Sequence, residues 1–157
     1  MAQKHRILAT HMHPMSEILN NNVLIVAIAA NFAAQLLKFL LTLAQTGELR
    51  LHVLVEPGGM PSSHSALVTA LATGIGITMG WGTPMFAIAS VFAVIVMYDA
   101  AGVRLAAGQQ AKVINQLVGE IFDADSAIDP LKELLGHTPI QVLAGAVLGF
   151  TIAWILV

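Results

Sequence analysis

Four long runs of apolar residues, separated by polar segments, dominate the pattern along this chain. They cover residues 23–44, 61–79, 84–98 and 139–157. A helix that crosses a bilayer needs about 20 mostly apolar residues, so each run is close to the length of a membrane span. The uncharged turn between the second and third runs is tight enough to join two neighbouring helices. The pattern therefore predicts about four transmembrane helices in one small bundle.

A different pattern fills residues 99–136, the only long polar stretch. Its apolar positions recur at helical spacing: Val103, Ala107, Ile114, Leu117, Val118 and Ile121. Its polar positions share the opposite face: Arg104, Lys112, Asn115 and Gln116. This spacing is typical of an amphipathic helix that packs at the membrane face. The predicted fold is thus all-α, a small polytopic membrane helical bundle with one amphipathic interfacial helix.

The composition agrees with this fold and excludes other classes of protein. Of 157 residues, 57% are hydrophobic and only 10% are charged, whereas a soluble domain carries about 25% charged residues. The chain has no cysteine, so it forms neither a disulfide nor a thiolate metal site. Its net charge of −2 and its lack of basic runs argue against a nucleic-acid partner. We expect an integral, multi-pass membrane protein surrounded by lipids; the sequence leaves open whether it forms a homo-oligomer.

The first 20 residues differ from the rest of the chain. They hold no continuous apolar run before Val23, so they do not resemble a cleavable signal peptide. We expect residues 1–20 to be a flexible polar leader, in which His11 and His13 are disordered rather than metal ligands. Residues 21–157 are expected to form a single membrane-embedded domain.

Counting the membrane crossings brings the polar segments together. If the second run starts at one membrane face, the third returns to that face and the fourth starts there. Residues 58–65, 99–112 and 136–141 then meet at this face, together with the end of the first run. An active site is the best common reason for such a convergence.

The first run carries a polar stripe. Polar residues recur every three or four positions: Asn31, Gln35, Lys38, Thr42 and Gln45. Polar groups inside a membrane are costly and usually face a cavity or a bundle interior. We expect Lys38 to point inward and bind substrate phosphate, with Gln35 in support. The alternative is that Lys38 merely extends toward the interface.

The second run opens with the most informative segment of the chain. It reads Gly58-Gly59-Met60-Pro61-Ser62-Ser63-His64-Ser65-Ala66. A glycine hinge at Gly59 precedes Pro61, which is expected to open a helix. Exposed amides, hydroxyls and an imidazole in the first turn then form an anion site. The alternative is that Ser62 or Ser63 only caps the helix.

Two further segments add charge and a second imidazole. Arg104 carries a planar fork that matches phosphate oxygens, and Asp99 is expected to position Arg104 or a backbone amide. The alternative for Arg104 is a pair with Asp99 or an anchor in the lipid headgroups. His137 precedes Thr138 and Gln141, whose spacing also fits a purely structural capping box. Below them the small residues Gly145, Gly149 and Ala153 continue one face, which turns His137 and Gln141 toward the bundle interior.

Two histidines beside cations suggest phosphoester chemistry. Imidazole can serve near neutral pH both as the nucleophile for phosphorus and as the acid for the leaving oxygen. The cations would neutralise charge on the transferring oxygens. We therefore expect neither a metal nor a cofactor, and phosphate or vanadate should fit the same site.

These residues resemble the type 2 phosphatidic acid phosphatase (PAP2) superfamily, whose relatives include vanadium-dependent haloperoxidases. The motif Pro-Ser-Gly-His appears here as Pro61-Ser62-Ser63-His64. The motif His-x-Pro-x-Asp-Val-Leu-Ala-Gly appears as His137-Thr138-Pro139-Ile140-Gln141-Val142-Leu143-Ala144-Gly145. The stretch from Asp99 to Arg104, with Gly108-Gln109-Gln110-Ala111 after it, is similar to the short divergent PAP2 branch.

The resemblance implies a PAP2-like fold and a metal-independent, acid-phosphatase-like reaction. The substrate would be a lipid or prenyl phosphate, as a monoester or diphosphate. His137 would be the nucleophile that forms a phosphohistidine, and His64 the acid that protonates the leaving alkoxide. Ser62, Ser63 and Arg104 would bind the phosphate oxygens. A haloperoxidase is not expected, because the site is embedded in a small membrane bundle.

The chain departs from the superfamily pattern at three positions. Gln45 stands seven residues after Lys38, where the first motif has an arginine, and Leu131 replaces the arginine expected six residues before the nucleophile. Gln141 replaces the carboxylate that orients the nucleophilic histidine. An amide still accepts a hydrogen bond from imidazole but does not stabilise an imidazolium electrostatically. The alternative function is therefore a catalytically weak or silent relative that binds a phosphorylated lipid or acts as a membrane assembly factor.

Overall fold

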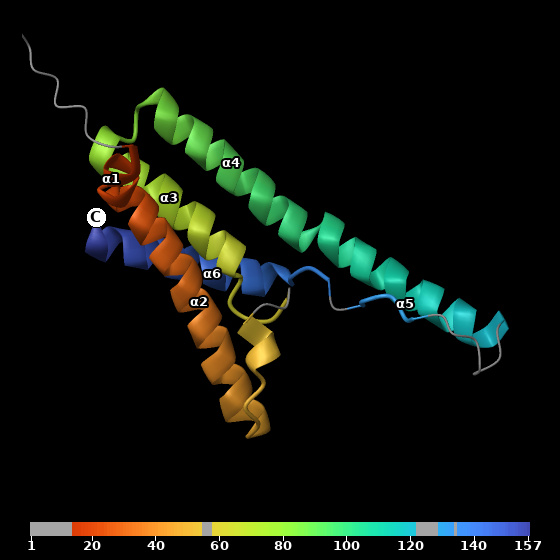
Figure 1. The fold of residues 1–157 in the computed structure, drawn as a ribbon. Coiled ribbons are helices and arrows are strands. Elements are labelled where there is room, and N and C mark those ends of the chain that lie inside the picture. The colour runs from red at the N-terminus through yellow and green to blue at the C-terminus, as the bar shows by residue number, and fades with distance from the viewer. Residues whose placement is uncertain (1–13, 55–57, 122–128, 134) are drawn as a thin grey trace, which may run out of the picture.

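A computed structural model describes residues 14–54, 58–121, 129–133 and 135–157 (Figure 1). Its helices are α1 (Pro14–Leu19), α2 (Asn22–Thr46), the short 3₁₀ helix η1 (Leu51–Leu54), α3 (Ser63–Met79), α4 (Pro84–Ala101), α5 (Val103–Ile121) and α6 (Pro139–Leu156). Three helical segments are long and apolar enough to cross a membrane: α2, α4 continued by α5, and α6. The apolar helix α3 is shorter. The described residues contain no strand, so the predicted all-α bundle is confirmed.

The helices of the bundle begin at side chains that cap their free amides. The four N-cap residues are Asn21, Ser62, Thr83 and Thr138. Pro84 and Pro139 occupy the first turns of α4 and α6, where a missing N–H does no harm. The expectation that Pro61 opens α3 is wrong, because the hydroxyl of Ser62 accepts from the amide of Ser65 and makes Ser62 the cap. Pro61 therefore lies before the cap, after a cis peptide bond.

Small residues let α3 lie at the centre of the bundle. It packs against α2, α4 and α6. The buried core consists of Val26, Ala27, Ala30, Ala34, Ala66, Ala70 and Ala153. On α6, Gly145 lies against the carbonyl of Ser62 and Gly149 against the carbonyl of Ala66, so that a Cβ at either glycine would overlap α3. The predicted small-residue face of α6 does turn toward the bundle interior.

The two ends of the bundle carry different parts of the chain. Figure 1 places α1, the turn between α3 and α4 and the C-terminus at one end. The side-chain amide of Asn22 donates to the carbonyl of Leu156 there, at 3.4 Å. The starts of α3 and α6 and the end of α4 lie at the other end. The polar segments predicted to converge therefore do lie at one end of the bundle.

Helix α5 projects from the bundle as an arm. Figure 1 shows it continuing roughly along the direction of α4, beyond the other helices. Residues 129–133 return along this arm. Asn115 fastens them, because its side chain donates to the carbonyl of Leu131 at 2.8 Å and accepts from the amide of Leu131 at 2.9 Å. The predicted amphipathic helix is present as α5, and the returning segment lies against it at Gly108.

The predicted leader lies partly outside the described residues. Residues 1–13, with His11 and His13, fall outside them. Residues 14–19 of the same stretch form the short helix α1.

Replacement of Gly149 by alanine should destabilise the bundle. The new methyl would meet the backbone of Ala66, and overpacking of this kind costs about 1–3 kcal/mol. At roughly 2–4 °C per kcal/mol for a chain of this size, the thermal midpoint of the detergent-solubilised protein should fall by several degrees. Gly119→Ala is the matched control, because a Cβ there meets nothing within 4 Å. Equal midpoints for the two variants would contradict the packing described here.

Candidate active site

Backbone contacts bring three distant segments together at the polar end of the bundle. The amide of Ser62 donates to the carbonyl of Gln141 at 3.0 Å, and the amide of His137 donates to the carbonyl of Ala100 at 2.9 Å. Gly136 has a φ of 86° and lies directly against the backbone of Leu105, so this position requires a residue without a side chain. These contacts fix the relative positions of three segments: the start of α3, the end of α4 and the start of α6.

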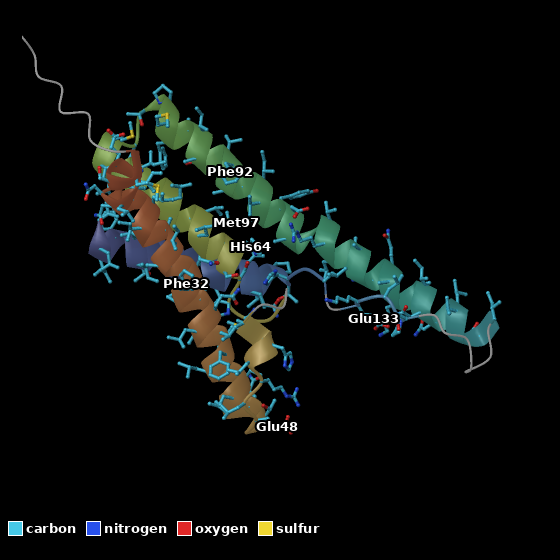
Figure 2. All side chains as sticks on the ribbon, viewed as in Figure 1. Phe32, Glu48, His64, Phe92, Met97 and Glu133 are labelled. Atoms are coloured by element: carbon cyan, nitrogen blue, oxygen red, sulfur yellow. The ribbon has the colours of Figure 1, made fainter. Side chains whose placement is uncertain are left out.

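A narrow cleft lies between these segments. It measures about 30 Å³ and is lined by His64, Val96, Asp99, Ala100, Arg104, Gly136 and His137. Figure 2 places His64 in the first turn of α3. His64 is exposed, whereas His137 is buried with 6% of its surface accessible. We call this the histidine cleft; it unites both predicted catalytic histidines with Arg104 and Asp99.

Asp99 holds Arg104 at the histidine cleft. The guanidinium Nε of Arg104 donates to Oδ2 of Asp99 at 2.6 Å, and both side chains are about half exposed. The predicted pair is therefore present. Arginine has five N–H donors, so one bond to a carboxylate leaves its fork able to bind an anion as well.

The surroundings of His137 favour its neutral form. Burial lowers the pKa of His137, and the positive charges of His64, Lys38 and Arg104 lower it further, in that order. Its Nδ1 is buried and has no hydrogen-bond partner among the described residues. A neutral imidazole keeps a lone pair at neutral pH, as a nucleophile or a general base requires.

Gln141 does not make the expected contact with His137. Its side-chain oxygen accepts from the amide of Thr138 at 3.0 Å, and the hydroxyl of Thr138 accepts from the amide of Gln141 at 3.4 Å. This is the capping box that the spacing also allowed. The cap engages the oxygen that was expected to orient the imidazole.

The hydroxyl of Ser62 also serves the helix rather than the cleft. Ser62 is fully buried, and its oxygen accepts from the amide and from the hydroxyl of Ser65, at 3.3 and 3.0 Å. Ser63 is buried as well, and neither serine lines the histidine cleft. The donors that the start of α3 offers are the backbone amides of Ser63 and His64, which no carbonyl of the same helix can reach.

Lys38 points inward, as predicted, but into a second and larger cavity. This cavity, the Lys38 pocket, measures about 330 Å³. Its lining residues are Lys38, Thr42, Val53, Gly58, Gly59, Leu105, Glu133, Leu135, Gly136, Thr138 and Gln141. Lys38 is only 5% exposed, and its ammonium donates to the carbonyl of Gly58 at 3.4 Å. Gly136 is the residue that lines both cavities.

The glycine hinge and Gln35 are placed around Lys38. Gly59 has a φ of 79°, and a Cβ there would come within 2.9 Å of Cδ of Lys38, so glycine lets the loop close over this side chain. Gln35 precedes Lys38 by one helical turn and lines neither cavity. Its side-chain oxygen is buried without a partner among the described residues.

Glu133 is a site residue that sequence reasoning missed. It lines the Lys38 pocket, and Figure 2 shows it beside α5. The side-chain amide of Asn115 donates to its carboxylate at 2.9 Å. In the sequence Glu133 lies four residues before His137. No helical or strand periodicity distinguishes it there from the neighbouring polar residues.

Comparisons with known proteins agree with the motifs. Residues 19–152 match the model of the divergent PAP2 family. The chain is 41% identical over 152 residues to a protein of Bacillus subtilis (strain 168) described as "Uncharacterized membrane protein YuiD". This match covers 89% of the chain and 96% of that relative. No solved structure gives a significant match.

The pKa of His137 should lie below 6.5, the value expected without perturbation. Burial and neighbouring cations disfavour the imidazolium, so Arg104→Gln should move the pKa upward. Histidine ¹⁵N NMR of the solubilised protein, with His137→Gln for assignment, measures it. Because the unfolded chain takes up this proton more readily, the free energy of unfolding should fall as the pH drops below 6.5. A pKa at or above 6.5 would contradict the described burial.

Proposed function

Because the chain belongs to the divergent PAP2 family, we propose that it is a membrane phosphatase acting on a lipid or isoprenoid phosphate. The observation that carries this proposal is the histidine cleft. Three segments far apart in sequence supply it with two imidazoles, one guanidinium and the carboxylate that positions the guanidinium. If these residues only stabilised the fold, they would not need to be grouped at the end of an apolar bundle, where polar side chains are energetically costly.

The proposed reaction proceeds in two steps. First, the neutral imidazole of His137 attacks phosphorus, and the bond from phosphorus to the leaving oxygen breaks while protonated His64 gives that oxygen its proton. Water then attacks the phosphohistidine with His64 as the base, and phosphate leaves. Arg104 and the first amides of α3 neutralise charge on the phosphoryl oxygens. No step in this scheme is assigned to a metal ion.

The proposal includes a multi-pass arrangement in the membrane. The helices α2, α3, α4 and α6 would each cross it, and the histidine cleft would lie at one face. A cleft at the membrane face reaches the phosphate of a lipid while the lipid chain stays in the bilayer.

A second function is favoured by the position of Gln141. Its oxygen is engaged in the cap of α6, and no side chain among the described residues forms a hydrogen bond with Nδ1 of His137. A protein that binds a phosphorylated lipid without turning it over would have no need of such support. In that case the chain would be a lipid-binding protein or a membrane assembly factor rather than an enzyme.

A phosphate-release screen separates the two functions. The purified protein would be offered phosphatidic acid, phosphatidylglycerol phosphate and prenyl phosphates without added metal, with vanadate as inhibitor. A phosphatase releases phosphate from at least one of them, and vanadate suppresses the release. Absence of release from every substrate, with phosphorylated lipid still bound, would establish the binding function instead.

The two histidines should fail in different ways. His137→Ala should abolish both turnover and the trapped phosphoenzyme, because it removes the nucleophile. His64→Ala should be severe for an alkyl phosphate and milder for an aryl phosphate, whose leaving oxygen needs little protonation. Rates with the two substrates, and acid-quenched labelling with ³²P, measure these effects. Equal losses of His64→Ala on both substrates would remove the acid role.

Gln141→Glu should preserve the fold and raise the rate. Glutamate is favoured at the same position of a capping box, so the start of α6 should survive. The added negative charge near His137 would stabilise the positive charge that develops on its imidazole ring as the bond to phosphorus forms. Comparison with amide-for-carboxylate exchange in catalytic triads places the gain anywhere from a few-fold to about 10⁴-fold. An unchanged kcat with an unchanged thermal midpoint would show that this position supplies only the cap.

A further inference from the structure

Helix α5 carries a row of mostly apolar residues that the rest of the described chain leaves exposed. Its members recur at intervals of three or four positions: Val103, Ala106, Gln110, Val113, Leu117 and Ile121. We propose that this row, the α5 stripe, is an interface with a second copy of the same chain, whose α5 packs alongside it in parallel. The inference concerns assembly and goes beyond the reaction proposed above.

The contacts that α5 makes within the chain lie on its other side. Gly108 lies against the backbone of Glu133, and the side chain of Asn115 bonds to Leu131 and to the Glu133 carboxylate. At 3.6 residues per turn, Gly108 and Asn115 lie roughly opposite Gln110. The returning segment therefore covers the far side of the helix and leaves the α5 stripe facing outward.

The bilayer is a poor cover for this stripe. The 38 residues of α4 and α5 rise by about 57 Å, whereas the hydrocarbon core is about 30 Å thick. Because α5 continues roughly along α4 in Figure 1, it would extend into water in the membrane arrangement proposed above. Helices that lie on a membrane surface are rich in lysine and arginine, but α5 has only Lys112 and Arg104, and Arg104 is paired with Asp99.

A second copy of α5 fits the spacing of the stripe. Alternating steps of three and four residues are the repeat of a coiled coil, in which each side chain enters a hole formed by four residues of the facing helix. In a parallel, in-register pair, residues 106, 109, 110 and 113 of one copy form the hole that receives Gln110 of the other. The structure has a groove of about 450 Å³ at this place, lined by Ala106, Gln109, Gln110, Val113 and Ile114.

The charges of α5 allow two identical faces to meet. The six members of the stripe are uncharged, and so are Gln109 and Gln116 at its edge. Lys112 and Arg104 lie on other sides of the helix, and Glu120 borders the stripe only near its end. Like charges are thereby kept apart over most of the length along which the two copies would touch.

The membrane and Gln110 both favour a parallel pair. Two copies inserted the same way in one bilayer are related by an axis along the membrane normal, so their α5 helices run in the same direction. Gln110 then meets its own counterpart. A carboxamide both donates and accepts, so the two side chains can bond to each other, and a single polar residue at such a position fixes the register.

Cysteine cross-linking in native membranes tests this interface. The chain has no cysteine, so single replacements report one position each. Val113→Cys and Leu117→Cys should each form a disulfide-linked dimer on mild oxidation, because parallel, in-register helices bring identical positions together. Lys112→Cys is the matched control, since Lys112 is exposed on the opposite side and should form little dimer. Equal cross-linking at all three positions, or none at the stripe, would overturn the proposal.

The mass of the purified protein tests the same contact without oxidation. Light scattering in mild detergent over a range of concentrations should show a dimer. Leu117→Ala should raise its dissociation constant at least about tenfold, because it removes buried apolar surface from both copies. Lys112→Ala should leave the constant unchanged, and circular dichroism checks that both variants are folded. A wild-type chain that stays monomeric throughout would overturn the proposal.

Labelling distinguishes a second copy from other covers of the stripe. A water-soluble maleimide added to opened membranes should react with Lys112→Cys faster than with Leu117→Cys. Equal rates would mean that nothing covers the stripe, and protection of Leu117→Cys in a monomeric protein would mean that lipid covers it; either result would refute the dimer. None of these measurements requires turnover, so their outcome is independent of the phosphate-release screen.

Discussion

The close backbone contact between α3 and α6 is the constraint on which the site depends. Gly145 and Gly149 let α6 approach the carbonyls of Ser62 and Ala66, and the amide of Ser62 bonds to the carbonyl of Gln141. Glycine contacts are effective in apolar bundles, where dispersion and close approach replace the hydrophobic effect. Because both helices begin at this contact, the histidines in and just before their first turns are brought to one cleft.

The charge state of each side chain at the histidine cleft depends on how deeply that side chain is buried. Asp99 and Arg104 remain half exposed and pair with each other, whereas His137 is buried and kept neutral by burial and by its cationic neighbours. The cap of α6 competes with the site for Gln141, and in the structure the cap has its oxygen. In the structure this side chain therefore stabilises the start of α6 and does not support the imidazole of His137.

Helix α5 contributes to the Lys38 pocket although it projects away from the bundle. Asn115 fastens the returning segment, and Gly108 lets that segment lie against α5. The same contacts place Glu133 in the lining of the Lys38 pocket. The chain then continues through Gly136 to His137. An element that is polar and amphipathic by sequence therefore shapes a cavity through the loop that it holds.

The sequence by itself determined the apolar helices, the convergence of the polar segments at one end of the bundle and the family. These features are local, or follow from counting crossings, because periodicity and capping depend on residues only a few positions apart. Only the tertiary structure decided where α3 begins, that Gln141 caps its helix, that Lys38 and the histidines line different cavities, and that Glu133 lines the same cavity as Lys38. A polar side chain with several possible partners bonds to one that lies within hydrogen-bond distance. Which partner lies that close depends on how segments remote in the sequence pack together.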